Sequence, residues 1–129
     1  MSSKKRKILL IDDEESICRF TKFNLESMGK YEVTTALSGE EGLKKVKETT
    51  FDLVITDFRM GGMNGEQVIE ELKKKNPDLP VLLFSIYHDD QSTVTPMLKS
   101  KADGLLTKPI DFEKFNETIE RVLEKFNKK

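Results

Sequence analysis

The chain has 129 residues, with 22 basic and 23 acidic side chains, a formal net charge of −1 and one cysteine. This length predicts one domain that is large enough to bury a hydrophobic core. The balanced charge argues against direct contact with nucleic acid, and a single cysteine excludes an intrachain disulfide. No apolar run approaches the roughly 18 residues of a membrane span, and no signal-peptide core follows the basic residues 4–7. We therefore expect a cytoplasmic protein that makes no membrane contact.

Short apolar runs alternate with amphipathic stretches along the whole chain. The apolar runs predict strands at residues 7–11, 31–36, 51–57, 79–85 and 103–107. The amphipathic stretches predict helices that begin near residues 15, 38, 65 and 111, with a weaker one across 88–101 that contains Pro96. In the first of these helices we expect Ile17, Phe20, Leu25 and Met28 on the buried side, and Cys18 as a buried residue.

This alternation determines the predicted fold class. Strands that alternate with helices form right-handed crossovers and a parallel sheet that is covered on both faces. The sequence therefore predicts a flavodoxin-like, doubly wound α/β fold with five strands in the order 2-1-3-4-5 and five helices.

Polar side chains end four of the five predicted strands. Asp12 and Asp13 follow the first strand, Asp57 ends the third, Ser85 the fourth, and Lys108 follows the fifth. Because parallel strands end at one edge of their sheet, these side chains should converge there. Carboxylates outnumber the ammonium group, so we expect a hard divalent cation, Mg²⁺, to balance them. Such a site suits a phosphoryl group, with Asp57 as a nucleophile that forms an acyl phosphate.

At this point the residues resemble the receiver domain of two-component response regulators, over nearly the whole chain from Lys7 to Phe126. The motifs that carry the resemblance are Ile11-Asp12-Asp13-Glu14, Thr56-Asp57-Phe58-Arg59-Met60, Met63-Asn64-Gly65, Ser85, and Ala102-Asp103-Gly104 leading to Thr107-Lys108-Pro109. The resemblance implies one receiver domain over residues 1–129, with its core at about 7–126.

The resemblance also implies a role for each site residue. Asp57 would accept phosphate from a sensor histidine kinase or a phosphotransfer protein, and the phosphorylated state would alter the binding of a downstream protein. Mg²⁺ would be held by Asp12, Asp13, Asp57 and the main-chain oxygen of Arg59. The Ser85 hydroxyl would follow the phosphoryl oxygen. Lys108 would be an ion-pair partner. The protein would be a regulatory phospho-acceptor that promotes its own phosphorylation and dephosphorylation, rather than an enzyme.

Several positions depart from the family pattern. Gly61 stands where proline is usual, Lys101 replaces a glycine, and Leu105 replaces the usual tyrosine or phenylalanine. We expect a looser loop at Gly61 and an unusual readout, because the aromatic half of the usual switch is missing. Arg59 and Tyr87 lie two residues beyond Asp57 and Ser85, and we expect them to tune hydrolysis of the acyl phosphate.

Three other interpretations compete with this one. An inactive receiver would serve only as a protein-interaction module, and Leu105 keeps that interpretation open. A Mg²⁺-dependent aspartyl phosphatase of the haloacid-dehalogenase type would need D-x-D after the first strand, where this chain has Asp12-Asp13-Glu14. A flavin-binding flavodoxin-type module would need a phosphate loop there, which four acids would repel. Whether the receiver stands alone or belongs to a longer chain stays open.

Overall fold

The computed structural model describes residues 5–58, 60–86, 102–108 and 111–127, and of these it describes only the main chain for Ser85, Ile86, Thr107, Lys108 and Asn127. One five-stranded sheet forms its centre, in the order β2-β1-β3-β4-β5, and each neighbouring pair is parallel. The strands are β1 (Arg6–Ile11), β2 (Tyr31–Ala36), β3 (Leu53–Asp57), β4 (Val81–Ile86) and β5 (Gly104–Lys108). The predicted fold class and strand order are confirmed.

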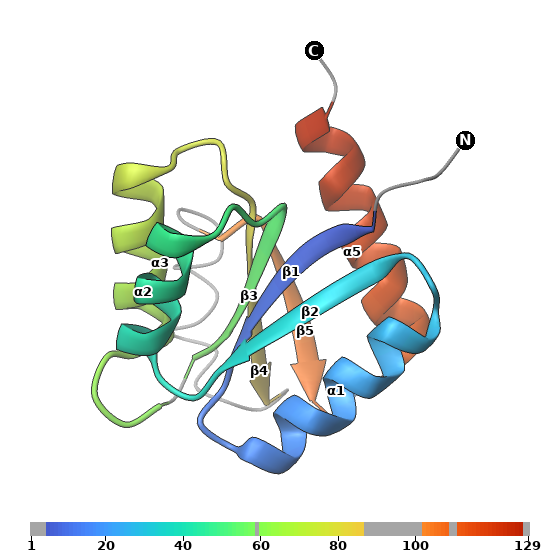
Figure 1. Ribbon diagram of the computed structural model, residues 1–129, viewed down its shortest axis with the longest axis horizontal. Coiled ribbons are helices and arrows are strands. Elements are labelled where there is room, and N and C mark those ends of the chain that lie inside the picture. The colour runs from blue at the N-terminus through green and yellow to red at the C-terminus, as the bar shows by residue number, and fades with distance from the viewer. Residues whose placement is uncertain (1–4, 59, 87–101, 109–110, 128–129) are drawn as a thin grey trace.

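Two layers of helices enclose this sheet (Figure 1). The described helices are α1 (Glu15–Ser27), α2 (Gly39–Glu48), α3 (Gly65–Lys75) and α5 (Phe112–Asn127). Helices α1 and α5 cover one face, and α2 and α3 cover the other. The described residues thus contain four helices against the five predicted, because the one expected across 88–101 lies outside them. None of the described helices is both long and apolar enough to span a membrane.

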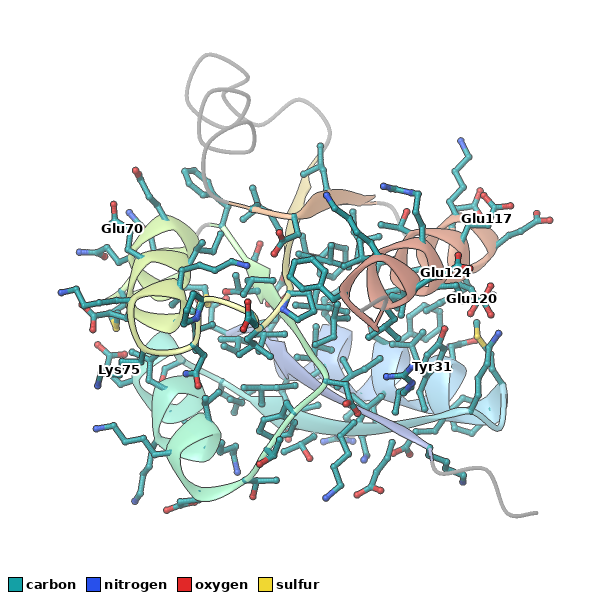
Figure 2. All side chains as sticks on the ribbon, turned by 90° about the horizontal axis from the view of Figure 1, so that it is seen from above. Tyr31, Glu70, Lys75, Glu117, Glu120 and Glu124 are labelled. Carbon is teal, nitrogen blue, oxygen red and sulfur yellow. The ribbon has the colours of Figure 1, made fainter. Side chains whose placement is uncertain are left out.

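The buried strands supply a core to both helical layers. In β1, Ile8 and Leu10 pack on the side of α1 and α5, while Leu9 and Ile11 pack on the side of α2 and α3. All four are completely buried, which explains why the strand is an uninterrupted apolar run. Figure 2 shows the same division in the labelled side chains: Tyr31 lies on the α5 side, whereas Glu70 and Lys75 project from α3.

Helix α1 differs from its prediction in one residue. Phe20, expected to be buried, is 56% exposed, and Phe23 is 72% exposed. The inward positions are Cys18, Thr21 and Leu25, which recur at helical spacing and lie against the sheet. Phe20 lies on the flank of α1, where its ring meets that of Phe112 edge to face with centroids 5.6 Å apart. The burial of Cys18 is confirmed.

Helix α3 begins with a capping box directly after the loop that follows β3. Asn64 accepts a hydrogen bond from the amide of Gln67 at 2.9 Å, and the Gln67 side chain accepts one from the amide of Asn64 at 2.9 Å. These two bonds satisfy main-chain donors that a helix start leaves without partners. The cap therefore fixes where α3 begins relative to the end of β3.

Candidate functional site

Three carboxylates meet at the carboxyl edge of the sheet. Ile11 pairs with Thr56 in the parallel ladder of β1 and β3, so the next residues, Asp12 and Asp57, leave adjacent strand ends. One carboxylate oxygen from each of Asp12, Asp13 and Asp57 lies within 4.8 Å of the others. Asp12 is completely buried, Asp57 is 7% exposed, and Asp13 is exposed. The predicted convergence of the three acids is therefore present in the structure.

Local hydrogen bonds hold Asp12 in place. Its amide donates to the carbonyl of Ala36 at 3.0 Å, which extends the β1–β2 pairing past the end of the strand. Its Oδ1 accepts from the amide of Glu14 at 2.9 Å, and the Cys18 thiol donates to its carbonyl at 3.3 Å. The turn into α1 thus fixes both the main chain and the carboxylate of Asp12.

Asp57 is held at the end of β3 by its own turn and by the start of α3. Its Oδ1 accepts from the amide of Phe58 at 2.9 Å, and its carbonyl accepts from the Thr56 hydroxyl at 3.0 Å. A Cβ at Gly65 would lie 2.6 Å from the Asp57 carbonyl oxygen and 2.9 Å from Phe58 Cα. Glycine is therefore required at the first residue of α3, which presses against the backbone of Asp57.

Asp13 differs from the other two acids in its exposure and in its hydrogen-bond partner. Its Oδ2 accepts from the amide of Gly61, in the loop between β3 and α3, at 3.4 Å. The next residue, Gly62, has a left-handed backbone with φ of 76°. The loop that carries Gly61 therefore contacts the exposed member of the acidic cluster.

The remaining predicted site residues are placed only in part. In the ladder of β3 and β4, Asp57 pairs with Phe84, and Ser85 is the next residue of β4. In the ladder of β4 and β5, Lys108 pairs with Ile86. The main chains of Ser85 and Lys108 therefore reach the same edge of the sheet as Asp57. Arg59 lies outside the described residues, as do Tyr87, Pro96 and Lys101. Leu105 is partly buried and packs against the core on the α2 and α3 side.

The donor set fits a magnesium ion. Hard divalent cations prefer oxygen ligands, and Mg²⁺ is usually held by one or two carboxylates together with water. Asp12, Asp13 and Asp57 offer three such oxygens within 4.8 Å. Three carboxylates so close together repel one another strongly, so binding a cation relieves an existing cost of the folded state.

A second charged cluster, at the opposite edge of the sheet, was not foreseen from the sequence. Asp103 Oδ2 accepts from Lys73 Nζ at 2.7 Å and from the amide of Val81 at 2.8 Å. Lys73 Nζ also donates to the Leu79 carbonyl at 2.8 Å. The lysine run 73–75 is typical of a helix C-terminus and gave no sign that one member reaches across to β5. This cluster anchors the start of β5 to α3.

Comparison with known proteins identifies the family. The family model of the response regulator receiver domain matches residues 8–120. This chain belongs to the response regulator receiver domain family. The predicted resemblance is confirmed by this match, and receiver domains are regulatory parts of two-component systems that interact with histidine kinases and downstream effectors.

Two curated relatives show how much of a longer protein this receiver domain matches. It is 39% identical over 123 residues to the transcriptional regulatory protein ZraR of Klebsiella oxytoca, which covers 95% of this chain and 27% of ZraR. It is 33% identical over 120 residues to the alkaline phosphatase synthesis transcriptional regulatory protein PhoP of Bacillus subtilis, covering 93% of this chain and 49% of PhoP. The chain thus spans between about a quarter and a half of these relatives.

Two solved structures match the receiver domain along nearly its whole length. A receiver domain protein from Clostridium thermocellum has a TM-score of 0.83 at 34% identity and covers 93% of this chain and 95% of its own. The response regulator TrrA from Thermotoga maritima, in complex with Mg²⁺ and BeF, has a TM-score of 0.81 at 34% identity and covers 91% and 98%. The receiver family binds Mg²⁺ at an acidic pocket, and the cluster of Asp12, Asp13 and Asp57 fits that property.

Proposed function

We propose that Asp57 accepts a phosphoryl group from the phosphohistidine of a sensor histidine kinase or a phosphotransfer protein. The observation that carries this proposal is the approach of three carboxylate oxygens to within 4.8 Å, with Asp57 among them and only 7% exposed. Residues 1–129 would act as a single receiver domain with its core at about 7–126. Phosphorylation would then alter the binding of a downstream protein.

The transfer itself needs little from the chain beyond placement of Asp57. A carboxylate oxygen of Asp57 attacks phosphorus, an oxygen–phosphorus bond forms, the phosphorus–nitrogen bond breaks, and its electron pair returns to the imidazole. The hydrogen bond from the Phe58 amide at 2.9 Å and the contact with Gly65 hold the carboxylate and its backbone in position for this attack. No general base is required, because the attacking group is a carboxylate, which has no proton to lose when the new bond forms.

The surrounding residues would stabilise the transferred charge. Asp12, Asp13, Asp57 and the main-chain oxygen of Arg59 would hold Mg²⁺, which supplies charge neutralisation on the phosphoryl oxygens. We propose that the Ser85 hydroxyl donates to a phosphoryl oxygen and that Lys108 forms an ion pair with it. The main chains of both residues reach the edge of the sheet at which Asp57 lies, which supports these two roles.

The proposal is tested by intact-mass measurement after incubation with acetyl phosphate and Mg²⁺. The expected result is a gain of one phosphoryl group, absent in Asp57→Asn and absent without Mg²⁺. Asp52→Asn is the matched control, because Asp52 comes directly before Leu53, where β3 begins, and contacts the Lys7 amide instead of the acidic cluster. No gain in the wild type would contradict the proposal and favour the phosphorylation-independent receiver that Leu105 suggests.

The exposed aromatic residues of α1 indicate where the phosphodonor protein could dock. Phe20 and Phe23, 56% and 72% exposed, line a groove with Glu15, Ser16 and Arg19. Large exposed apolar side chains that gather in one place mark interaction sites. Because α1 begins two residues after Asp13, we propose that the phosphodonor protein docks on this face when it presents its histidine to Asp57.

Two phosphate donors separate docking from chemistry. The protein donor is a phosphorylated histidine kinase selected because it loads the wild-type chain, and the small donor is acetyl phosphate. Phe23→Ser should slow transfer from the kinase about tenfold or more, as expected for loss of an aromatic contact at an interface. Its rate with acetyl phosphate should stay unchanged. Equal rates with the kinase for variant and wild type would contradict the docking proposal and leave Asp57 as the acceptor.

A further inference from the structure

The loop between β3 and α3 reaches the exposed member of the acidic cluster through a main-chain donor. The amide of Gly61 donates to Asp13 Oδ2 at 3.4 Å, and Asp13 is the exposed member of the three acids. We infer that Gly61 is a positioning residue whose amide holds the Asp13 carboxylate toward Asp12 and Asp57 and so raises the affinity of the cluster for a divalent cation. The inference rests on the proposed function, since it concerns the same metal site.

The scaffold places this amide independently of Asp13. Met63, two residues on, packs so closely on the start of α2 that a Cβ at Gly39 would lie 3.0 Å from Met63 Cβ. Asn64 begins α3 with its capping box. Between these anchors and Gly61, Gly62 has a φ of 76°, a conformation that glycine adopts without strain. The loop is therefore held from α2 and α3, and Asp13 meets a donor that is already in place.

A donor that is already in place matters most for an exposed carboxylate. The burial of Asp12 and Asp57, and the hydrogen bonds to their carboxylates, already restrict those two side chains. Asp13 is exposed, so without a partner its carboxylate would turn among several rotamers, and a bound cation would have to restrict them. A hydrogen bond from Gly61 that selects the orientation facing Asp12 and Asp57 removes part of that cost before the cation arrives.

This contact depends on the amide hydrogen that Gly61 carries. Proline has no amide hydrogen, so a proline at position 61 could not donate to Asp13. Gly61 itself is not among the glycines with positive φ, and a Cβ built on it meets nothing within 4 Å. The position therefore accepts a side chain sterically, and the amide hydrogen is the property that distinguishes glycine or alanine from proline there.

The test is isothermal titration of Mg²⁺ into the full chain. Gly61→Pro removes the donor, and Gly61→Ala is the matched control because it keeps the donor and adds a Cβ in open space. Because the bond is long, the expected loss of Mg²⁺ affinity in Gly61→Pro is about two- to fivefold, while Gly61→Ala should stay within about 1.5-fold of the wild type. Equal affinities in both variants would overturn the inference and leave the acceptor proposal intact. No Mg²⁺ binding by the wild type would overturn both.

If circular dichroism shows that Gly61→Pro does not fold, a second pair of variants tests the inference. Gly62→Ala keeps every amide but strains the loop at its φ of 76°, so it should shift the loop away from Asp13 and weaken Mg²⁺ binding about twofold. Gly29→Ala is the control: its φ is 82°, its Cβ meets nothing within 4 Å, and it follows α1 away from the site. Unchanged Mg²⁺ affinity in Gly62→Ala, equal to that of Gly29→Ala, would overturn the inference.

Discussion

Acidic residues have different neighbours at the two edges of the sheet. At the amino edge, Asp103 is matched by Lys73 Nζ at 2.7 Å and by the Val81 amide at 2.8 Å. At the carboxyl edge, Asp12, Asp13 and Asp57 bring their carboxylates within 4.8 Å of one another. An aspartate therefore pairs with a lysine at one edge, whereas at the other edge three aspartates lie close to one another, where carboxylates repel. Such a local cost is expected where a protein keeps a binding site at the expense of stability.

Removing the ion pair between Lys73 and Asp103 at the amino edge should have the largest effect on stability. Asp103→Asn leaves Lys73 without a charged partner in a pair whose side chains are 24% and 18% exposed. We expect the free energy of unfolding to fall by about 2 kcal/mol, less than for a fully buried pair because water still reaches both groups. Urea denaturation followed by circular dichroism measures the change.

The matched control for this prediction is the exposed pair at the same edge. Arg6 and Asp52 lie 3.9 Å apart with both side chains 39% exposed, so Arg6→Gln should change the free energy of unfolding by less than about 0.5 kcal/mol. If Arg6→Gln and Asp103→Asn had equal effects on the free energy of unfolding, the pairing of Lys73 with Asp103 would not anchor β5 to α3.

Binding of Mg²⁺ should offset the repulsion among the three carboxylates at the carboxyl edge and so stabilise the folded protein. At ten times its dissociation constant, Mg²⁺ should raise the free energy of unfolding by about 1.4 kcal/mol through binding to the folded state alone. Asp13→Asn and Asp57→Asn should each lose most of this gain, whereas Asp52→Asn should keep it, because Asp52 lies outside the cluster. Urea denaturation with and without Mg²⁺ gives the comparison, and an equal gain in all variants would contradict a site at Asp12, Asp13 and Asp57.

Removing one charge from the cluster should also stabilise the protein when Mg²⁺ is absent. Asp57→Asn keeps an oxygen that can accept from the Phe58 amide and removes repulsion with Asp12 and Asp13. We expect the free energy of unfolding to rise by about 1 kcal/mol, opposite in sign to the same substitution at Asp103. A loss of stability in Asp57→Asn without Mg²⁺ would show that repulsion among the carboxylates does not control stability at this edge.

A pH-dependent effect is expected at the contact between β2 and α5. Tyr31 is 1% exposed, and its hydroxyl donates to Asn116 Oδ1 at 2.7 Å. Burial raises the pKa of Tyr31 from its usual 10.0 to about 12, and the charge of Glu120 contributes to this rise. Above pH 10 the unfolded chain loses this proton while the folded chain keeps it, so stability should fall as pH rises from 10 to 12.

Tyr31→Phe isolates this contribution. Lysines titrate in the same range, so the relevant quantity is the difference in slope between wild type and Tyr31→Phe in urea denaturation at pH 10 to 12. The wild type should lose stability more steeply with rising pH. Parallel slopes would show that Tyr31 titrates at the same pH in the folded and unfolded chains.

The sequence was sufficient for the fold and for the placement of the acids. Alternating apolar runs and amphipathic stretches determine a parallel sheet, and polar residues that follow buried strands must lie at its carboxyl edge. Asp12, Asp13 and Asp57 were therefore predictable as a cluster. The roles of Ser85, Lys108 and Arg59 stay predictions.

Other features could not be predicted because they depend on orientation within an element. Phe20 is more hydrophobic than Thr21, so an apolar pattern places Phe20 inward, yet the orientation of α1 puts Thr21 against the sheet. The Lys73–Asp103 pair joins residues 30 positions apart, and nothing local marks it. The contact of Gly61 with Asp13 depends on the loop conformation, which the positive φ of Gly62 helps to set.

The most direct test of the central claim locates the phosphoryl group in the chain. After loading with acetyl phosphate and Mg²⁺, borohydride reduces an acyl phosphate on aspartate to the alcohol, which converts that residue into homoserine. Peptide sequencing by mass spectrometry then identifies the position. We predict homoserine at position 57 and at no other acid, including Asp12 and Asp13. Homoserine at another position, or none in a chain that has gained a phosphoryl group, would contradict the assignment of Asp57 as the acceptor.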